Sequence, residues 1–353
     1  MKRHPSSWVP GVLLCVAFPA AALAQDTTRA APFQLHGFLE VYYRDGDATT
    51  RDGYRLRKAD IKFSGDISRH IRWRLGFDAS KALTLTKATT QEGNDAVVTD
   101  VAVDQRSRWV QDAALTVSLA PSVSLDIGQQ IIPMSLEGTI PTSLVETVER
   151  TLFIVERSRG TGLGDVRDIG ASLNSRGNTV VEYHVGLFNE TGEGQNTTDP
   201  NDQKALVGRV AFHPAPLSGF SVGGSGAFEG GPVSSQRRER YGAETQYKDD
   251  RITLRTEFIG ARDGELRRFG WYGLAAVHPT HDWQLSGRLD NWDRDRGAET
   301  SLFDAFERQL TLGASYLVDG GFGRVVANVV HATYPLLTLR ANNFALVAFE
   351  AAW

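Results

Sequence analysis

Basic side chains recur at alternate positions of several extended segments in this sequence. Arg72 and Arg74 are two residues apart, and alternation along a strand points both of them to the same side. By the same parity, the basic side chains on this polar face are Lys58, Lys62, Arg72, Arg74, Arg209, Arg255 and Arg288. Because guanidinium groups bind oxyanions through paired hydrogen bonds, the chemistry that these residues offer is anion binding.

Acidic side chains share this polar face and leave a second interpretation open. They are Glu40, Asp60, Asp78, Asp112, Asp126, Glu182, Glu244, Glu257 and Asp290. A base that forms an ion pair with one of these acids would stiffen the protein and would not be free to bind a solute. If this face instead lined a water-filled space, its charged side chains of both signs would decide which ions enter that space.

Motifs for bond-making chemistry are weak in this chain. The stretch GFSVG at 219–223 has the spacing of a hydrolase nucleophile, but a strand continues through it where that motif needs a strand, a turn and a helix. Ser221, His184 and His213 do not gather at one rim by parity, so a β-barrel hydrolase is the weaker alternative. The histidines lack metal-ligand spacing, and DRDRG at 293–297 lacks the rest of a calcium loop. We therefore expect no enzyme, no metal and no cofactor.

Alternation of apolar and polar residues dominates the chain and predicts an all-β fold. The stretch IRWRLGFDAS at 71–80 puts Trp73 and Phe77 on one face and Arg72 and Arg74 on the other. Sixteen such segments begin near residues 33, 54, 71, 109, 122, 166, 178, 203, 219, 239, 251, 268, 282, 306, 322 and 343. Most reach about ten residues, the length of a strand that crosses a bilayer at a tilt. Arginines on the lipid side would cost about 2–4 kcal/mol each near the midplane, so we predict that Arg72 and Arg74 face a lumen.

The connections between these segments differ in length on the two sides, which is typical of outer-membrane barrels. Tight connections are expected at 119–125 and 213–220. The long, polar connections are 82–108, 132–165 and 189–203. Helical pattern is nearly absent, and its best candidate, 143–149, lies within one of the long connections.

The last segment, NNFALVAFEAAW, alternates up to the carboxyl terminus and puts Phe349 and Trp353 on the same face. A soluble β-sandwich that ends on an edge strand is the alternative to a barrel. The even number of segments, the asymmetric connections and the terminal aromatic residue favour a transmembrane antiparallel β-barrel of about 16 strands.

The amino-terminal residues have the pattern of a cleavable export signal. Lys2 and Arg3 precede an apolar run at 9–20, and ALA at 22–24 matches the small-x-small cleavage pattern. We predict a signal peptide at 1–24 and a single outer-membrane barrel domain at 25–353. The location would be the outer membrane of a Gram-negative-type bacterium, with its lipids as partners.

The chain that remains after cleavage has no cysteine, because Cys15 lies within the predicted signal. It has 36 basic residues, which is 38 minus Lys2 and Arg3, against 42 acidic residues, and thus a net charge of −6. A basic surface is what nucleic-acid binding requires, so we expect no nucleic-acid partner.

Ordered motifs over roughly residues 54–213 resemble the phosphate-selective porin family, the porin O and P type. The resemblance lies in Gly128, Gln129, Pro133 and SLE at 135–137, followed by ERS at 156–158, RDIG at 167–170 and, at 186–189, Gly-x-Phe-Asn. It implies a sixteen-stranded trimeric channel whose long third loop folds into the lumen. Its implied solutes are small and hydrophilic, chiefly anions such as phosphate.

The stretch GQQIIPMSLE at 128–137 fits such a loop, because apolar residues follow a strand where a surface loop would be polar. These apolar residues would pack the loop against the wall: Ile132, Met134, Leu136, Leu152, Phe153 and Ile154. The residues expected at the constriction are Pro133, Glu137, Arg150, Arg157 and Arg159. The family carries a lysine just before this proline, whereas Gln130, Ile131 and Ile132 stand here. A general, non-specific porin is therefore the alternative function.

Overall fold

The structure is a computed structural model that describes residues 34–45, 52–81, 84–92, 95–104, 109–155, 163–177, 180–189, 203–229, 237–297, 306–318, 322–333 and 342–353. The predicted signal segment 1–24 lies outside these residues, as do Arg157 and Arg159 of the expected constriction.

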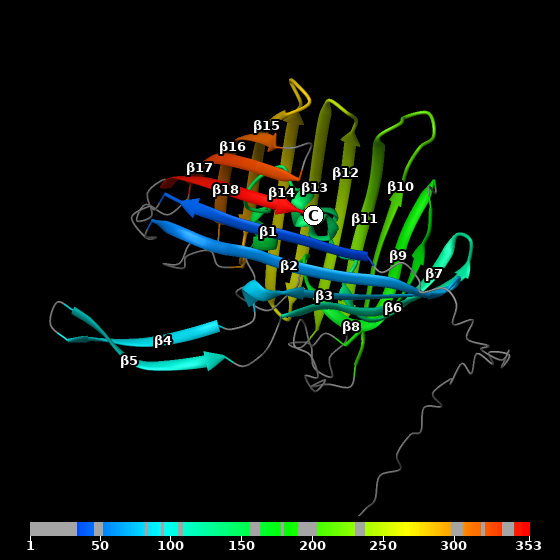
Figure 1. Cartoon of the computed structure of the whole chain (residues 1–353), viewed down its shortest axis with the longest axis horizontal. Helices are drawn as coiled ribbons and strands as arrows, with labels where there is room; N and C mark the ends of the chain where they lie inside the picture. Colours follow the sequence, from blue (N-terminus) through cyan, green and yellow to red (C-terminus); the bar gives the residue numbers. More distant parts are fainter. Residues whose placement is uncertain are drawn as a thin grey trace, which may run out of the picture.

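Sixteen antiparallel strands close into one barrel (Figure 1). Each strand pairs with the next one along the ring, and β1 closes the ring on β18 through pairs such as Tyr42 with Ala348. The strands of the barrel are β1 (Gln34–Arg44), β2 (Gly53–Ser68), β3 (Ile71–Asp78), β6 (Val110–Ala120), β7 (Val123–Ile131), β8 (Arg167–Ser175), β9 (Val181–Phe188), β10 (Ala205–Phe212), β11 (Phe220–Glu229), β12 (Arg238–Lys248), β13 (Ile252–Asp263), β14 (Leu266–Val277), β15 (Trp283–Asp293), β16 (Phe306–Val318), β17 (Gly323–Thr333) and β18 (Asn342–Ala352).

The predicted segments correspond one to one with these sixteen strands, and the all-β barrel prediction is confirmed. Alternation was least regular at 322–333, which nevertheless forms β17. Here Val326 and Val330 are buried on one face while Val329 is exposed on the other, so valines on both faces obscure the period.

The connection at 82–108 contains regular structure that the sequence analysis did not expect. Strands β4 (Thr84–Glu92) and β5 (Asp95–Asp104) pair in a separate two-stranded sheet, and Figure 1 shows this hairpin away from the barrel wall. The segment is rich in threonine and valine, whose branched Cβ atoms favour extended backbone. Treating it as a polar loop was therefore wrong in detail.

The two faces of the sheet differ as predicted. On β13, Leu254 and Phe258 are 48% and 46% exposed, whereas Glu257 between them is fully buried. Aromatic side chains also gather on the apolar face, where the rings of Trp283 and Tyr316 lie 5.1 Å apart. This arrangement puts apolar groups toward lipid and charged groups toward the lumen, as in outer-membrane barrels.

The connections are short at one end of the barrel and mostly long at the other. At the short end, hereafter the turn side, successive strands are joined by residues such as 69–70, 121–122 and 249–251. At the other end, the loop side, the joining residues include 79–109, 132–166 and 189–204, with 264–265 as a short exception. None of the helices in the described residues is long and apolar enough to cross a membrane.

Candidate functional site: the interior of the barrel

The connection between β7 and β8 is the third one on the loop side, and it is compact over its described residues. It contains α1 (Leu136–Thr139), a 3-10 helix (Thr142–Leu144) and α2 (Leu152–Val155). The predicted helix at 143–149 is thus wrong beyond its first residues, because the backbone of Val148 bonds to the barrel instead. Ser135, with a φ of 71°, caps α1 by accepting a hydrogen bond from the N–H of Gly138.

Backbone groups of this connection bond to side chains on widely separated strands. The N–H groups of Leu136 and Glu137 donate to the carboxylate of Glu257 on β13, at 2.9 and 3.2 Å. The N–H of Val148 donates to Asn328 on β17 at 2.7 Å. The N–H of Ser135 donates to Ser225 on β11 at 3.2 Å. In a closed barrel, only the inner face lets so short a segment reach β11, β13 and β17 together.

Two of the predicted arginines hold this connection. The guanidinium of Arg255 makes a bidentate pair with Glu146 at 3.0 and 3.1 Å. Arg288 donates to the hydroxyl of Thr147 at 2.6 Å and to the carbonyl oxygens of residues 149 and 150 at 2.7 and 3.0 Å. Its own strand supplies Asp290 at 2.7 Å. Both arginine side chains are 1% exposed, so they bind the protein and not the solvent.

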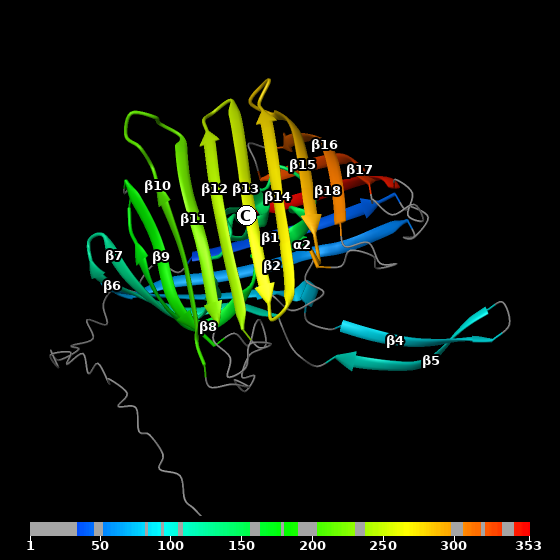
Figure 2. The same cartoon turned by 180° about the vertical axis from the view of Figure 1, so that it is seen from behind.

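Apolar contacts add to these bonds. The six residues expected to pack this segment are all buried. Phe153 packs on Tyr272 and Trp292, with ring centroids 6.0 and 6.3 Å apart, and all three are almost fully buried. Figure 2 shows α2 behind the strands that carry these rings. Inward-facing aromatic residues on β14 and β15 were not predicted, since parity gave that face to polar residues only.

The remaining constriction residues within the described chain are buried as well. Pro133 precedes α1, and Glu137 accepts a hydrogen bond from the N–H of Thr151 at 2.7 Å. Arg150 donates to the carbonyl oxygens of Glu137 and Ile140 and lies 3.7 Å from Asp165. These side chains connect the two arms of the loop to each other.

Two more predicted bases pair with acids of the wall. Arg209 on β10 binds Glu182 at 2.8 Å and Glu244 at 2.6 Å, and 8% of its side chain is exposed. Lys58 on β2 lies 3.5 Å from Asp78 and 3.8 Å from Asp60. At these two positions the geometry agrees with the second interpretation of the sequence, in which the bases pair with acids and stiffen the barrel wall.

Three bases on β2 and β3 are placed differently. Arg74 pairs with Asp126 at 2.9 Å and keeps 32% of its side chain exposed. Arg72 is exposed and donates only to the neutral side chains of Gln34 and Ser64 within the described residues. Lys62 is also exposed and forms no ion pair in this part of the chain. We call Lys62, Arg72 and Arg74 the cationic row.

One basic residue that contacts the loop was missed by parity. Strands β1 and β2 slip in register between Glu40 and Val41, which pair with Lys58 and Leu56 and leave Arg57 as the extra residue of a bulge. Arg57 therefore faces the lumen beside Lys58, binding Glu40 at 3.0 Å and Glu149 at 3.1 Å. Two adjacent basic residues, RK at 57–58, were the only sequence signal of this irregularity.

Within the described residues, no group of three His, Cys, Asp or Glu side chains is arranged to hold a metal ion.

Comparisons with known proteins agree with this architecture. The sequence profile of the family described as phosphate-selective porin O and P matches residues 31–229. No curated protein sequence matches the chain significantly.

Several solved structures share the fold at low identity. An anion-selective porin from Comamonas acidovorans is 12% identical, with 92% of this chain and all of that chain covered at a TM-score of 0.63. OmpT of Vibrio cholerae, folded in vitro in a trimer form, is 10% identical, with 92% and 100% covered at a TM-score of 0.61. The outer membrane channel DcaP of Acinetobacter baumannii is 11% identical, with 92% and 97% covered at a TM-score of 0.59.

Proposed function

The chain belongs to the phosphate-selective porin O and P family, and on that premise we propose that this outer-membrane porin passes small solutes by diffusion with a preference for anions. The similarity to an anion-selective porin supports this direction. The observation that carries the proposal is the cationic row, because its three side chains are the most exposed of the predicted inward bases.

The position of the row suits ion passage. Arg72 and Arg74 are two residues apart on β3, which separates them by about 7 Å along the strand. Lys62 pairs with Gly76 on β3, so the three charges follow one another on neighbouring strands. An anion leaving one guanidinium would find the next within reach. The nearby carboxylate of Asp126 offsets part of this charge, so the preference should be modest.

The connection 132–166 sets the narrowest point of the bore in this proposal. Its bonds fasten it to β11, β13, β15 and β17, and Arg57 near the loop-side end of β2 also binds its Glu149. Arg72 and Arg74 of the cationic row lie on β3 closer to the turn side. Solutes would therefore pass between the loop and the wall that carries the row. We further propose that the signal peptide 1–24 is removed on export and that the mature chain forms a homotrimer, as one similar structure does.

The test is the reversal potential of single channels in a potassium chloride gradient. The double variant Arg72→Glu/Arg74→Glu reverses two charges, and an anion about 4 Å from one charge feels on the order of 4 kcal/mol at an effective dielectric constant near 20. Water and salt reduce this value, but the reversal potential should still move toward cation selectivity. Arg72→Gln/Arg74→Gln should give an intermediate shift.

The matched control is Arg262→Glu/Arg267→Glu, which reverses two arginines on the other face of the sheet and should leave the reversal potential unchanged. If the Arg72/Arg74 variant folds, conducts and keeps the wild-type potential, ions do not visit the row. A wild-type reversal potential near zero would favour the general, non-specific porin. The net charge of −6 and the pairing of most lumen bases with carboxylates are consistent with that alternative.

A further inference from the structure

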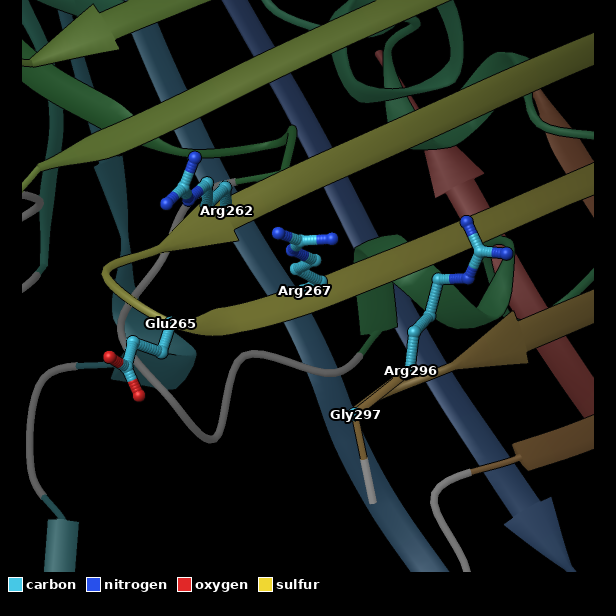
Figure 3. Close-up of a pocket in the computed structure, with 5 residues that line it drawn as sticks. All are labelled: Arg262, Glu265, Arg267, Arg296 and Gly297. Carbon is cyan, nitrogen blue, oxygen red and sulfur yellow. The ribbon is translucent and has the colours of Figure 1, made fainter. Parts of the chain in front are cut away.

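A cluster of arginines lies at the loop side of β13, β14 and β15, outside the lumen. Arg262 is the last residue but one of β13, Arg267 is the second residue of β14, and Arg296 follows β15. Together with Glu265 and Gly297 they line a pocket of about 580 Å³. Figure 3 shows the three guanidinium groups on the same side of these strands, with Glu265 at the turn between two of them.

The register places this pocket on the lipid-facing surface. Arg262 has the parity of Leu254 and Phe258, which are the exposed apolar residues of β13. Arg267 lies directly opposite Arg262 in the β13–β14 ladder and so points the same way. The guanidinium of Arg296 lies 5.4 Å from the ring centroid of Phe269, which is on that face too.

The depth of the pocket corresponds to the lipid headgroups. One step along the strands toward the barrel centre, Phe269 pairs with Gly260, and Gly260 pairs with Tyr241. The ring of Tyr241 covers Gly260 and is 60% exposed. Aromatic rings of this kind mark the boundary between the hydrocarbon and the headgroups. The arginines come immediately beyond that boundary, on the side of the long loops.

Within the described residues, the charges of this cluster lack carboxylate partners. Like charges directly opposite each other on a ladder repel, as Arg262 and Arg267 do. Glu239 pairs with Arg262 in register and Glu265 lies in the turn, yet no ion pair joins either of them to the three arginines within the described residues. Arg262 donates only to the carbonyl oxygen of Gly264, at 2.9 Å. The site is therefore built for an anion supplied from outside the chain.

We propose that this pocket binds the phosphate groups of a lipid headgroup in the leaflet on the loop side. Long loops face outward in outer-membrane barrels, so this leaflet is the outer one, where phosphorylated glycolipids are found. Several guanidinium groups around one pocket can bind phosphate oxygens through paired, charge-assisted hydrogen bonds. The acyl chains of the lipid would then follow the apolar wall below, beginning with Tyr241 and Phe258.

The experiment is native mass spectrometry of the full chain in a neutral detergent, titrated with diphosphoryl lipid A, monophosphoryl lipid A and a phosphate-free lipid of the same acyl chains. Wild type should bind them in that order of affinity. The variant Arg262→Gln/Arg267→Gln/Arg296→Gln should bind diphosphoryl lipid A about tenfold more weakly or worse, equivalent to about 1.4 kcal/mol or more. The control Arg69→Gln/Arg176→Gln/Arg251→Gln removes three exposed arginines on the turn side and should bind as wild type does.

Equal binding of the three lipids by wild type would overturn the proposal, and this arm does not depend on whether the variant folds. So would unchanged lipid binding by the variant. If the variant formed a smaller oligomer than wild type and kept its lipid binding, the arginine surface would be a contact between subunits, and the proposal would be overturned. Tight binding of inorganic phosphate alone would assign the pocket to a free anion. The reversal potential of the variant should match wild type, which separates this inference from the proposed selectivity of the bore.

Discussion

The substitution Arg288→Met tests whether the guanidinium groups hold the loop against the wall. Methionine keeps an unbranched side chain and removes every side-chain hydrogen bond of Arg288. Three of those bonds reach the loop, at Thr147, Glu149 and Arg150, and a fourth reaches Asp290 on its own strand.

The size of the effect follows from the bonds removed. Hydrogen bonds to charged groups contribute about 1.5–3 kcal/mol each, so three of them contribute about 4.5–9 kcal/mol if they are additive. Neighbouring bonds are not fully additive, and the loop keeps its pair between Arg255 and Glu146. The substitution also leaves the buried carboxylates of Asp290 and Glu137 without this cation, which adds to the loss. Since 1.4 kcal/mol is a factor of ten in population, detached loop conformations should become frequent.

Single-channel recording is the assay, with heat-modifiable migration of the folded barrel as the measure of folding. Arg288→Met should raise the mean conductance and the current noise, because the loop leaves the bore part of the time. Arg209→Met is the matched control. Arg209 is similarly buried, but its partners Glu182 and Glu244 belong to the wall, so the conductance should stay close to wild type.

Two results would refute this reasoning. A folded Arg288→Met channel with wild-type conductance and noise would show that the loop does not need these bonds. An equal rise in Arg209→Met would show that loss of a positive charge, and not release of the loop, changes the current.

The remaining predictions concern barrel closure and one turn. A Cβ atom at Gly37 would overlap the ring of Trp353, whose backbone carbonyl accepts a hydrogen bond from the N–H of Gly37 at 2.8 Å. Gly37→Val should therefore lower the yield of heat-modifiable barrel in the outer membrane. The control Gly273→Ala has open space around its new methyl group and should not lower that yield. Deleting Trp353 should lower that yield as well, and wild-type yields from both variants would remove its role in closure. Hydrogen bonds from the hydroxyl of Tyr247 and the N–H groups of Arg251 and Ile252 lower the pKa of Asp249 in the turn before β13. A lowered folded pKa means that this stabilisation is complete above the unfolded pKa, about 3.9, and is lost as the pH falls through the folded value. Asp249→Asn should therefore unfold faster in urea than wild type at pH 7 and at the same rate at strongly acidic pH; a difference that persists in acid would contradict this account.

The sequence predicted the barrel well because the alternation of faces repeats in every strand. Arg72 and Arg74 stand among Trp73, Leu75 and Phe77, and only one orientation of such a strand avoids arginine in lipid. Strand positions could be predicted for the same reason, since each segment carries its own pattern. The third connection was predicted from its apolar residues together with the family resemblance.

The interior could be predicted less completely, because it depends on which side chains meet across the barrel. Parity identified Arg255 and Arg288 as inward bases, but their partners Glu146 and Thr147 come from a loop without periodicity. The bulge that turns Arg57 inward depends on the register between β1 and β2, which neither strand determines alone. The outward arginine cluster depends on the pairing register of β13, β14 and β15, which places Arg262 opposite Arg267 and brings Arg296 from the end of the next strand beside them.

The bonds that fasten the third connection also constrain the order of folding. Its partners are synthesised much later: Leu136 bonds to a residue 121 positions downstream, Arg150 to one 138 positions downstream and Val148 to one 180 positions downstream. Contacts between residues this distant must wait for the intervening chain to be in place. The loop therefore cannot dock until β13, β15 and β17 have joined the sheet. If this loop narrows the bore as proposed, we expect the barrel to close as an open cylinder before it is constricted, with a higher permeability in that interval than in the finished channel.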